Sequence, residues 1–200
     1  MRILIAGLIG GLVMFMWGAV AHMALPIGEM GVKIPAQQEA ALDAIGRSSA
    51  GEGVYMYPSM PMEDWSDADK AKAFGEQVRG KPSAFVVYQP NGNPAAQSMT
   101  PNLVKQFLAV TAAALLVAWV MALGAWGFSR RLLIAGAMGL FSWLTISLPY
   151  WNWFMFPLDF TIANLIEQVV GWLLAGAAMA WWLGRGNRTI AQAPTRDPVE

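Results

Sequence analysis

The polar groups that could carry chemistry are few, because the sequence has one histidine, His22, and only isolated polar residues within its long apolar stretches. Three of these polar residues, Asn164, Glu167 and Gln168, occur together in one stretch near the C-terminus. A carboxylate in a membrane-spanning helix is costly and is therefore a candidate for binding an ion, a proton or a substrate. The candidate intramembrane polar site consists of His22, Asn164, Glu167 and Gln168.

A structural explanation competes with this functional one. Glu167 is expected about two turns from the outer end of its helix, where water or a lipid headgroup reaches it. His22 would then be a satisfied interfacial side chain and Glu167 a hydrogen-bonding partner for a neighbouring helix. If the two residues lie at similar depths, they can pair, and an imidazole beside a carboxylate forms a proton-responsive element.

Glycines and alanines in the same helices indicate close helix packing. Gly7, Gly11 and Gly18 precede His22 at separations of four, seven and four residues, which places all four near one stripe of a helix. Small residues four apart allow a second backbone to approach. The predicted helix-packing positions are Gly7, Gly11, Gly18, Gly171 and Ala175.

Several classes of chemistry are excluded by composition. The absence of cysteine removes disulfides and thiol sites, and a single histidine without cysteine is too few for the usual ligand sets of a zinc site. Methionine thioethers bind Cu(I), but the methionines of the first helix and the following segment lack a repeated Met-x-x-Met spacing, so gap filling in apolar packing is favoured. They are Met14, Met16, Met23, Met30, Met56, Met60 and Met62. A net charge of zero gives no reason to expect a nucleic-acid partner. We expect no cofactor and no metal.

Four apolar runs supply the elements that must position these groups, over residues 3–25, 103–128, 132–148 and 160–183. The chain is 56% hydrophobic and 13% charged, against about 25% charged in a typical soluble domain. Each run is long enough, or nearly so, to cross a bilayer. The sequence predicts a first transmembrane helix in residues 1–25 and three more in residues 103–184.

Arginines suggest how these helices are oriented. Arg2, the pair Arg130 and Arg131, and Arg185 with Arg188 fall on one side if four helices alternate, and by the positive-inside rule this side is cytoplasmic. The expected location is the bacterial inner membrane, with both termini in the cytoplasm, residues 26–102 outside and residues 185–200 forming a disordered cytoplasmic tail. An aromatic turn containing Tyr150, Trp151 and Trp153 would lie at the outer interface.

The first helix has an alternative interpretation, because Ala19-Val20-Ala21 resembles the A-x-A cleavage site of a signal peptide. Apolar character continues through Leu25, so a retained anchor is favoured.

The segment 26–102 has its own periodicity and is predicted to be a small extracytoplasmic α/β domain. Helices are expected at 35–45 and from Ser66 or Asp67 to about Val78, with strands at 53–57 and 84–88. Its core is thin for its length, so it is expected to need support from elsewhere.

The predicted fold is an all-α membrane protein, a four-transmembrane-helix bundle with a small extracytoplasmic α/β cap between helices one and two. The favoured function is a non-enzymatic accessory, assembly or interaction subunit, whose partners are the lipid bilayer and a membrane protein or a second copy. The alternative is a small oligomeric carrier or channel with a polar site near His22 and Glu167. An enzyme would need more titratable groups than these.

Overall fold

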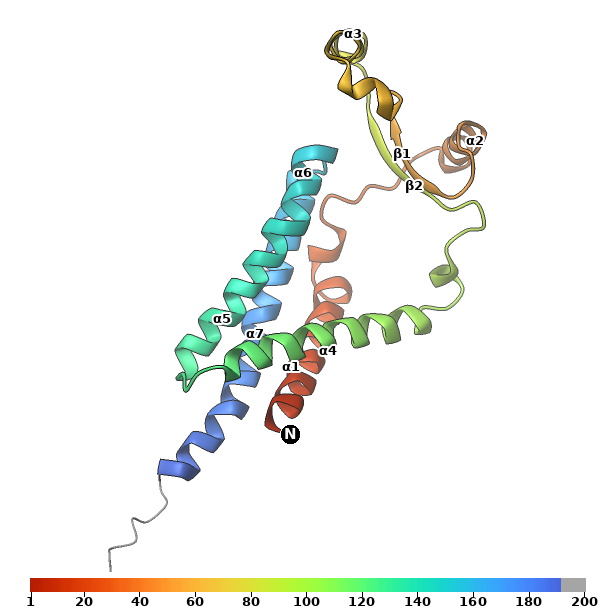
Figure 1. Cartoon of the computed structure of the whole chain (residues 1–200). Helices are drawn as coiled ribbons and strands as arrows, with labels where there is room; N and C mark the ends of the chain where they lie inside the picture. Colours follow the sequence, from red (N-terminus) through yellow and green to blue (C-terminus); the bar gives the residue numbers. More distant parts are fainter. Residues whose placement is uncertain (192–200) are drawn as a thin grey trace, which may run out of the picture. The chain divides into compact units, whose positions relative to one another are not determined.

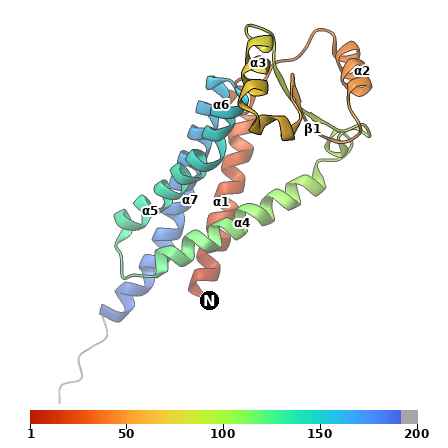
Figure 2. The same cartoon turned by 45° about the horizontal axis from the view of Figure 1, so that its top comes forward.

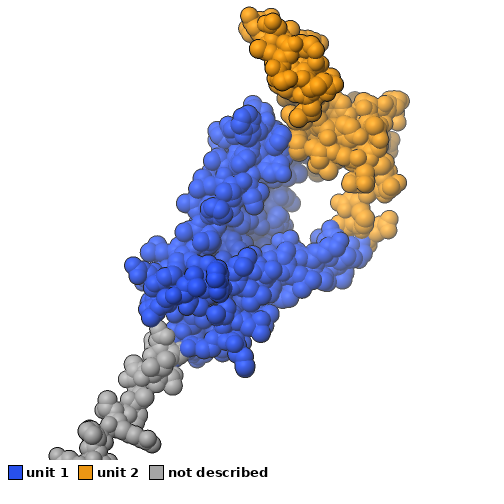
Figure 3. Space-filling view, viewed as in Figure 1, with its two compact units in different colours: residues 1–33, 98–200 blue, residues 34–97 orange. Residues whose placement is uncertain are grey.

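A computed structural model describes the backbone of residues 1–191 and the side chains of residues 1–185. The chain separates into two compact units, which Figure 3 shows in different colours. Unit 1 combines Met1–Lys33 with the chain from Ser98 onward, and unit 2 is Ile34–Gln97. The protein is mostly helical, with a single two-stranded sheet among the described residues.

Unit 1 contains four helical segments that are long and apolar enough to cross a membrane. They are α1 (Arg2–Met23), α4 (Thr100–Ala122), the segment Phe128–Phe154 that includes α5 (Phe128–Ser142) and α6 (Leu148–Phe154), and α7 (Leu158–Ala191). α1 packs against both α4 and α7, and α7 packs against α5. The helices therefore lie in the order α4, α1, α7, α5, and Figures 1 and 2 show α4 crossing α1 and then diverging from the others.

The core of unit 1 is built from small residues and methionines. Its fully or almost fully buried members include Ala6, Ala114, Ala118, Met121, Ala135, Ala175 and Met179. Small side chains let helix backbones approach closely, and flexible thioethers fill the remaining irregular spaces. Buried residues of α4 begin at Thr111, so the diverging N-terminal half of this helix has none.

The third apolar segment is longer than the sequence predicts. The helix was expected to stop at Pro149, but it continues to Phe154 through a π-helical stretch, Trp143–Ser147 (η4). In this stretch the N–H of Leu148 bonds to the carbonyl of Trp143, so the turn is wider just before the proline. A π-bulge and the first turn of a helix both tolerate a residue without an N–H, which explains how the helix passes Pro149.

The last helix also extends beyond its expected end. α7 is described to Ala191, past Leu183 and past Arg185, so the first residues of the predicted tail 185–200 are helical. The rest of that tail, residues 192–200, lies outside the described residues.

Unit 2 contains the secondary structure that its sequence predicts. Its strands are β1 (Gly53–Tyr57) and β2 (Ala84–Tyr88), which pair antiparallel with Tyr55 opposite Val86. Its α-helices are α2 (Gln38–Ser48), three residues later than expected, and α3 (Ala68–Val78). The carboxylate of Asp67 accepts hydrogen bonds from the N–H groups of Asp69 and Lys70, which is the predicted cap of α3.

Short 3₁₀ turns complete the chain. They are η1 (Pro26–Glu29) in unit 1, and η2 (Met62–Ser66) and η3 (Pro94–Ala96) in unit 2.

The two faces of the small sheet have different environments. On one face, the hydroxyl of Tyr57 lies 3.0 Å from Oγ of Ser48 and 3.2 Å from Oγ of Ser49, at the end of α2. These hydrogen bonds, Ser48 first, lower the pKa of Tyr57 from its ordinary value because they favour the phenolate. The opposite face carries Val54 and Val87, which are 62% and 66% exposed. One sheet face therefore contacts a helix, and the other carries these two exposed valines.

Candidate functional site

Two sets of close backbone contacts hold α1 in the middle of unit 1. A β-carbon at Gly11 would lie 2.7 Å from Cα of Thr111 on α4, and one at Gly7 would lie 2.9 Å from Cα of Leu115. On another side of α1, a β-carbon at Gly10 would overlap the thioether of Met179 on α7. The predicted packing role of Gly7 and Gly11 is therefore visible as a crossing with α4.

The remaining predicted packing residues differ from one another. A β-carbon at Gly171 on α7 would lie 2.6 Å from the indole ring of Trp17, and Ala175 is fully buried. A β-carbon at Gly18 would meet no atom within 4 Å, so the close contacts made at Gly7 and Gly11 are not repeated at this position. Figure 1 shows α1 and α4 crossing and then separating.

His22 and Glu167 are brought together at the end of the α1–α7 contact. Nε2 of His22 lies 3.3 Å from Oε1 of Glu167, and the side chains are 54% and 22% exposed. One turn earlier on α1, the indole N–H of Trp17 donates to the backbone carbonyl of Glu167 at 2.9 Å. The contact expected from the similar depths of these residues is present.

The turn after α1 fixes the position of the imidazole, which sequence reasoning did not anticipate. A β-carbon at Gly28 in η1 would lie 2.8 Å from Cα of His22 and would overlap its ring nitrogen Nδ1. Gly31 has a φ of 78°, and its Cα is packed so closely against Phe160 that a β-carbon would lie 2.6 Å from that side chain. The sequence shows two glycines, Gly28 and Gly31, shortly after Pro26, which indicate close backbone approach. The sequence does not show that the surfaces approached are those of His22 and Phe160.

The other two candidate polar residues do not join the pair. The hydroxyl of Ser142 on α5 donates to Oε1 of Gln168 at 3.2 Å. The amide of Asn164 donates to the carbonyl of Phe160, one turn earlier in its own helix, at 2.8 Å. Adjacent positions on a helix point about 100° apart, so Glu167 faces α1 whereas Gln168 faces α5.

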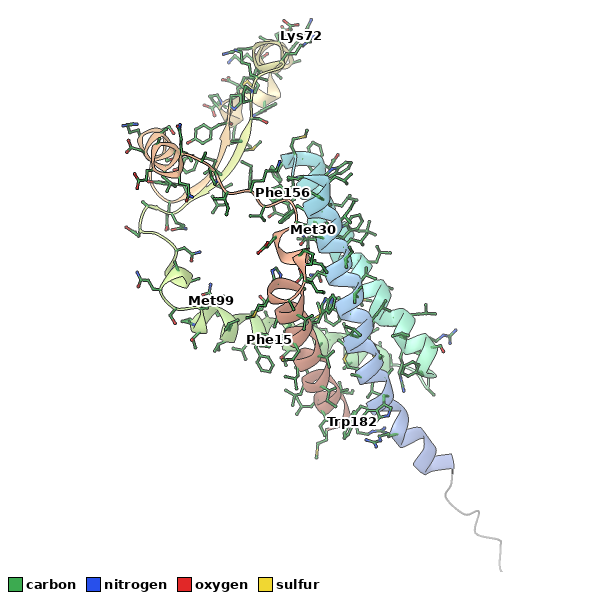
Figure 4. The ribbon with its side chains drawn as sticks, turned by 180° about the vertical axis from the view of Figure 1, so that it is seen from behind. Phe15, Met30, Lys72, Met99, Phe156 and Trp182 are labelled. Atoms are coloured by element: carbon green, nitrogen blue, oxygen red, sulfur yellow. The ribbon has the colours of Figure 1, made fainter. Side chains whose placement is uncertain are left out.

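The predicted aromatic turn is partly a helix. Tyr150, Trp151 and Trp153 lie in α6, with exposed fractions of 41%, 41% and 73%. The actual turn follows at Met155, whose left-handed backbone (φ 58°) ends the helix. Tyr150 contacts Phe156, which is labelled in Figure 4, with ring centroids 5.2 Å apart. The aromatic side chains cluster as expected. The chain reverses at Met155, five residues after Tyr150, where the predicted turn begins.

The chemical capacity of the His22–Glu167 pair is limited by its surroundings. An imidazole and a carboxylate in contact can share or exchange a proton. Deeper between α1 and α7 the side chains are apolar, with Met14 beside Gly171 and Met179 beside Gly10. The polar pair is therefore a local feature at one end of the helix contact, and no polar path leads from it between these two helices in residues 1–185.

Comparisons with protein-family models, with curated proteins and with solved structures find no match to this chain.

Proposed function

We propose that this chain is a non-enzymatic accessory, assembly or interaction subunit of the bacterial inner membrane, and that unit 2 supplies its contact with a partner. One observation carries the proposal: none of residues 34–97 in unit 2 is buried. A two-stranded sheet is marginally stable without further strands or a covering layer. A segment with defined helices and strands but no core of its own is expected to complete that core against another surface.

The exposed valines of the sheet give this contact a place. Val54 lies opposite Val87, and Met56 on the same face is 49% exposed. Further exposed apolar side chains of unit 2 include Leu42, Met62 and Trp65. Soluble surfaces seldom expose contiguous apolar patches without a partner or a membrane to cover them.

The membrane part of the proposal rests on the helices and on charge. Four helices of unit 1 have the length and hydropathy of membrane spans. Arginines occur before the first span, between the second and third, and after the fourth, and these places share one side of the membrane if the spans alternate in direction. The positive-inside rule then favours cytoplasmic termini and an extracytoplasmic segment 26–102. The central packing of α1 between α4 and α7 favours a retained anchor over a cleaved signal peptide.

Reporter fusions test this topology. Fusions at Ser129 and after Arg188 should report the cytoplasm, and a fusion at Gly92 should report the outside. A cytoplasmic signal at Gly92 would overturn the layout. The mass of the N-terminal peptide of the purified protein decides whether residues 1–21 are retained.

Site-specific photocrosslinking tests the interaction role. A photoreactive residue at Val87, which is 66% exposed, should give an adduct of one defined mass in intact membranes. The matched control is the same residue at Ala73, an exposed position on α3. Twice the mass of the chain would indicate self-association, and another single mass a stoichiometric partner. Equal, diffuse adducts from both positions would contradict the proposal.

A small oligomeric carrier or channel is the second candidate, and the His22–Glu167 contact is the observation that favours it. A polar pair in the outer half of a helix contact is a common feature of ion and proton pathways. Proton flux into liposomes containing the purified protein distinguishes the two. We expect no flux above that of empty liposomes, whereas flux abolished by Glu167→Gln would favour the carrier.

A further inference from the structure

A buried arginine without an acidic partner lies at the end of unit 1 where α5 begins. Arg131 is only 5% exposed. Its Nε–H donates to the carbonyl of Met121 near the end of α4, at the long distance of 3.4 Å. This bond uses only one of the five N–H donors of the guanidinium. No carboxylate forms an ion pair with Arg131 among the side chains of residues 1–185. A buried charge without a partner is costly, so the remaining donors call for an anion.

The Arg131 side chain lines a groove of about 470 Å³ between the start of α5 and the last turns of α7. Pockets of a few hundred cubic ångströms are of the size that binds small ligands and headgroups. We call this the arginine groove. It is lined by Trp126, Gly127, Phe128, Arg131, Ala180, Trp181, Gly184 and Arg185.

The backbone of the arginine groove is also suited to an anion. α5 begins at Phe128 after Gly127, and no side chain caps its first N–H groups. Its first turn contains no acidic residue. The N-terminus of a helix attracts anions through its free N–H groups and its dipole. The unpaired guanidinium of Arg131 and this helix end therefore favour the same kind of ligand.

The described segments around the arginine groove contain no competing carboxylate. Among residues 1–191, the ranges 1–28, 77–158 and 168–191 contain no aspartate or glutamate, and they include every described segment at this end of the helices. A second cavity of about 360 Å³ is also lined by Arg131, together with Arg2. Arg2 itself donates to the carbonyl of Leu183 at 2.9 Å. Within residues 1–191, the segments at this end thus contribute arginines and no acidic residue.

Tryptophans indicate that the anion belongs to a lipid. Trp126 and Trp181 line the arginine groove, and the guanidinium carbon of Arg185 lies 4.0 Å from the centre of the Trp181 ring. Tryptophan favours the headgroup level of a bilayer, where one part of the ring is apolar and the N–H is polar. Trp181 is 55% exposed, so its surface remains available to an acyl chain or a glycerol backbone.

We propose that the arginine groove binds the phosphate of one anionic phospholipid, with Arg131 and Arg185 contacting the phosphate and Trp126 and Trp181 flanking the glycerol region. Basic pockets between transmembrane helices bind anionic headgroups in this way. The proposal rests on the membrane location of unit 1, but it is independent of the interaction role of unit 2.

Thermal unfolding of the purified full chain in a non-ionic detergent tests the proposal. Phosphatidylglycerol, phosphatidylcholine and inorganic phosphate are titrated separately, and the midpoint of unfolding is followed by tryptophan fluorescence. Phosphatidylglycerol alone should raise the midpoint in a saturable manner. An equal rise with phosphatidylcholine would overturn the proposal, and an equal rise with inorganic phosphate would assign the groove to a free anion rather than a lipid.

Three matched variants locate the effect. Arg131→Gln and Arg185→Gln should each weaken the apparent affinity for phosphatidylglycerol about tenfold, because each removes a charge-assisted contact. Arg130→Gln removes the same charge from an exposed neighbouring position and should change the affinity less than about twofold. Arg185 is exposed, so Arg185→Gln should fold even if Arg131→Gln does not. Equal affinities of Arg185→Gln and Arg130→Gln would refute the site.

Discussion

Unit 1 and unit 2 differ in where their stabilising contacts come from. Unit 1 buries a set of alanines, glycines and methionines between helices far apart in sequence. Unit 2, over residues 34–97, has complete helices and strands and buries none of its side chains. Both units therefore form the secondary structure that their local sequence favours, but among the described residues only unit 1 forms a buried core.

The helix contacts of unit 1 give the largest expected effect. Gly11→Leu should destabilise the protein by about 3 kcal/mol or more, because the new side chain would be forced into the backbone of α4 at Thr111. Gly18→Leu is the matched control, since a β-carbon there meets no atom within 4 Å. It should change the free energy of unfolding by less than about 0.5 kcal/mol. Unfolding in detergent, followed by tryptophan fluorescence, measures both, and equal effects would show that α1 does not pack on α4 through Gly11.

Amide hydrogen exchange tests the contrast between the units directly. In the purified protein without a partner, the amides of β1 and β2 should exchange at least about a hundredfold faster than those in the middle of α1, because local opening of unit 2 exposes little new apolar surface. Addition of a partner should slow exchange in the strands and leave α1 unchanged. Strand amides as protected as those of α1 in the isolated protein would show that unit 2 is stable by itself.

The polar pair offers a smaller effect inside unit 1. His22→Ala and Glu167→Gln should be non-additive in a double-mutant cycle, because both remove the 3.3 Å contact. Hydrogen bonds between side chains in membranes average about 0.6 kcal/mol, and the half-exposed imidazole places this pair near that value.

A third variant sharpens the cycle. Gly28→Ala should displace the imidazole of His22 and lower the free energy of unfolding of the otherwise wild-type protein. The same substitution should cost less in the His22→Ala variant, because that variant has no ring to displace. Purely additive free energies of unfolding in both experiments would mean that the contact contributes nothing.

Within unit 2, the hydroxyl of Tyr57 provides the smallest expected effect. Its pKa is lowered by the hydroxyls of Ser48 and Ser49, so Tyr57 should ionise at a lower pH than an ordinary tyrosine. Because the pKa is lower in the folded state than in the unfolded state, any stability it contributes is present at alkaline pH and is lost as the pH falls through the folded pKa.

An ultraviolet titration of the wild type and Tyr57→Phe measures this. Loss of the earliest tyrosine transition in Tyr57→Phe is expected, and Ser48→Ala should shift that transition to higher pH. An unchanged titration curve in both variants would contradict the hydrogen bonds to the end of α2.

The sequence by itself determined the elements whose signals are local. The bounds of β1 and β2 are those predicted, because turn residues and alternating side chains mark both ends of each strand. The Asp67 cap fixes the start of α3 in the same way. The four apolar runs were also visible, since the length needed to cross a bilayer is a property of the segment alone. The pairing of His22 with Glu167 was a hypothesis from counting residues along those runs, and the two side chains lie 3.3 Å apart.

Only the tertiary structure decided what each helix face contacts. Gly11 and Gly18 look alike in the sequence, but only Gly11 lies at the crossing with α4. Gln168 belongs to a contact with α5 rather than to the pair at Glu167, and Arg131 is buried whereas Arg130 is exposed. The physical reason is that helix rotation and crossing are fixed by packing between distant segments, and a shift of one residue turns a side chain by about 100° toward a different neighbour.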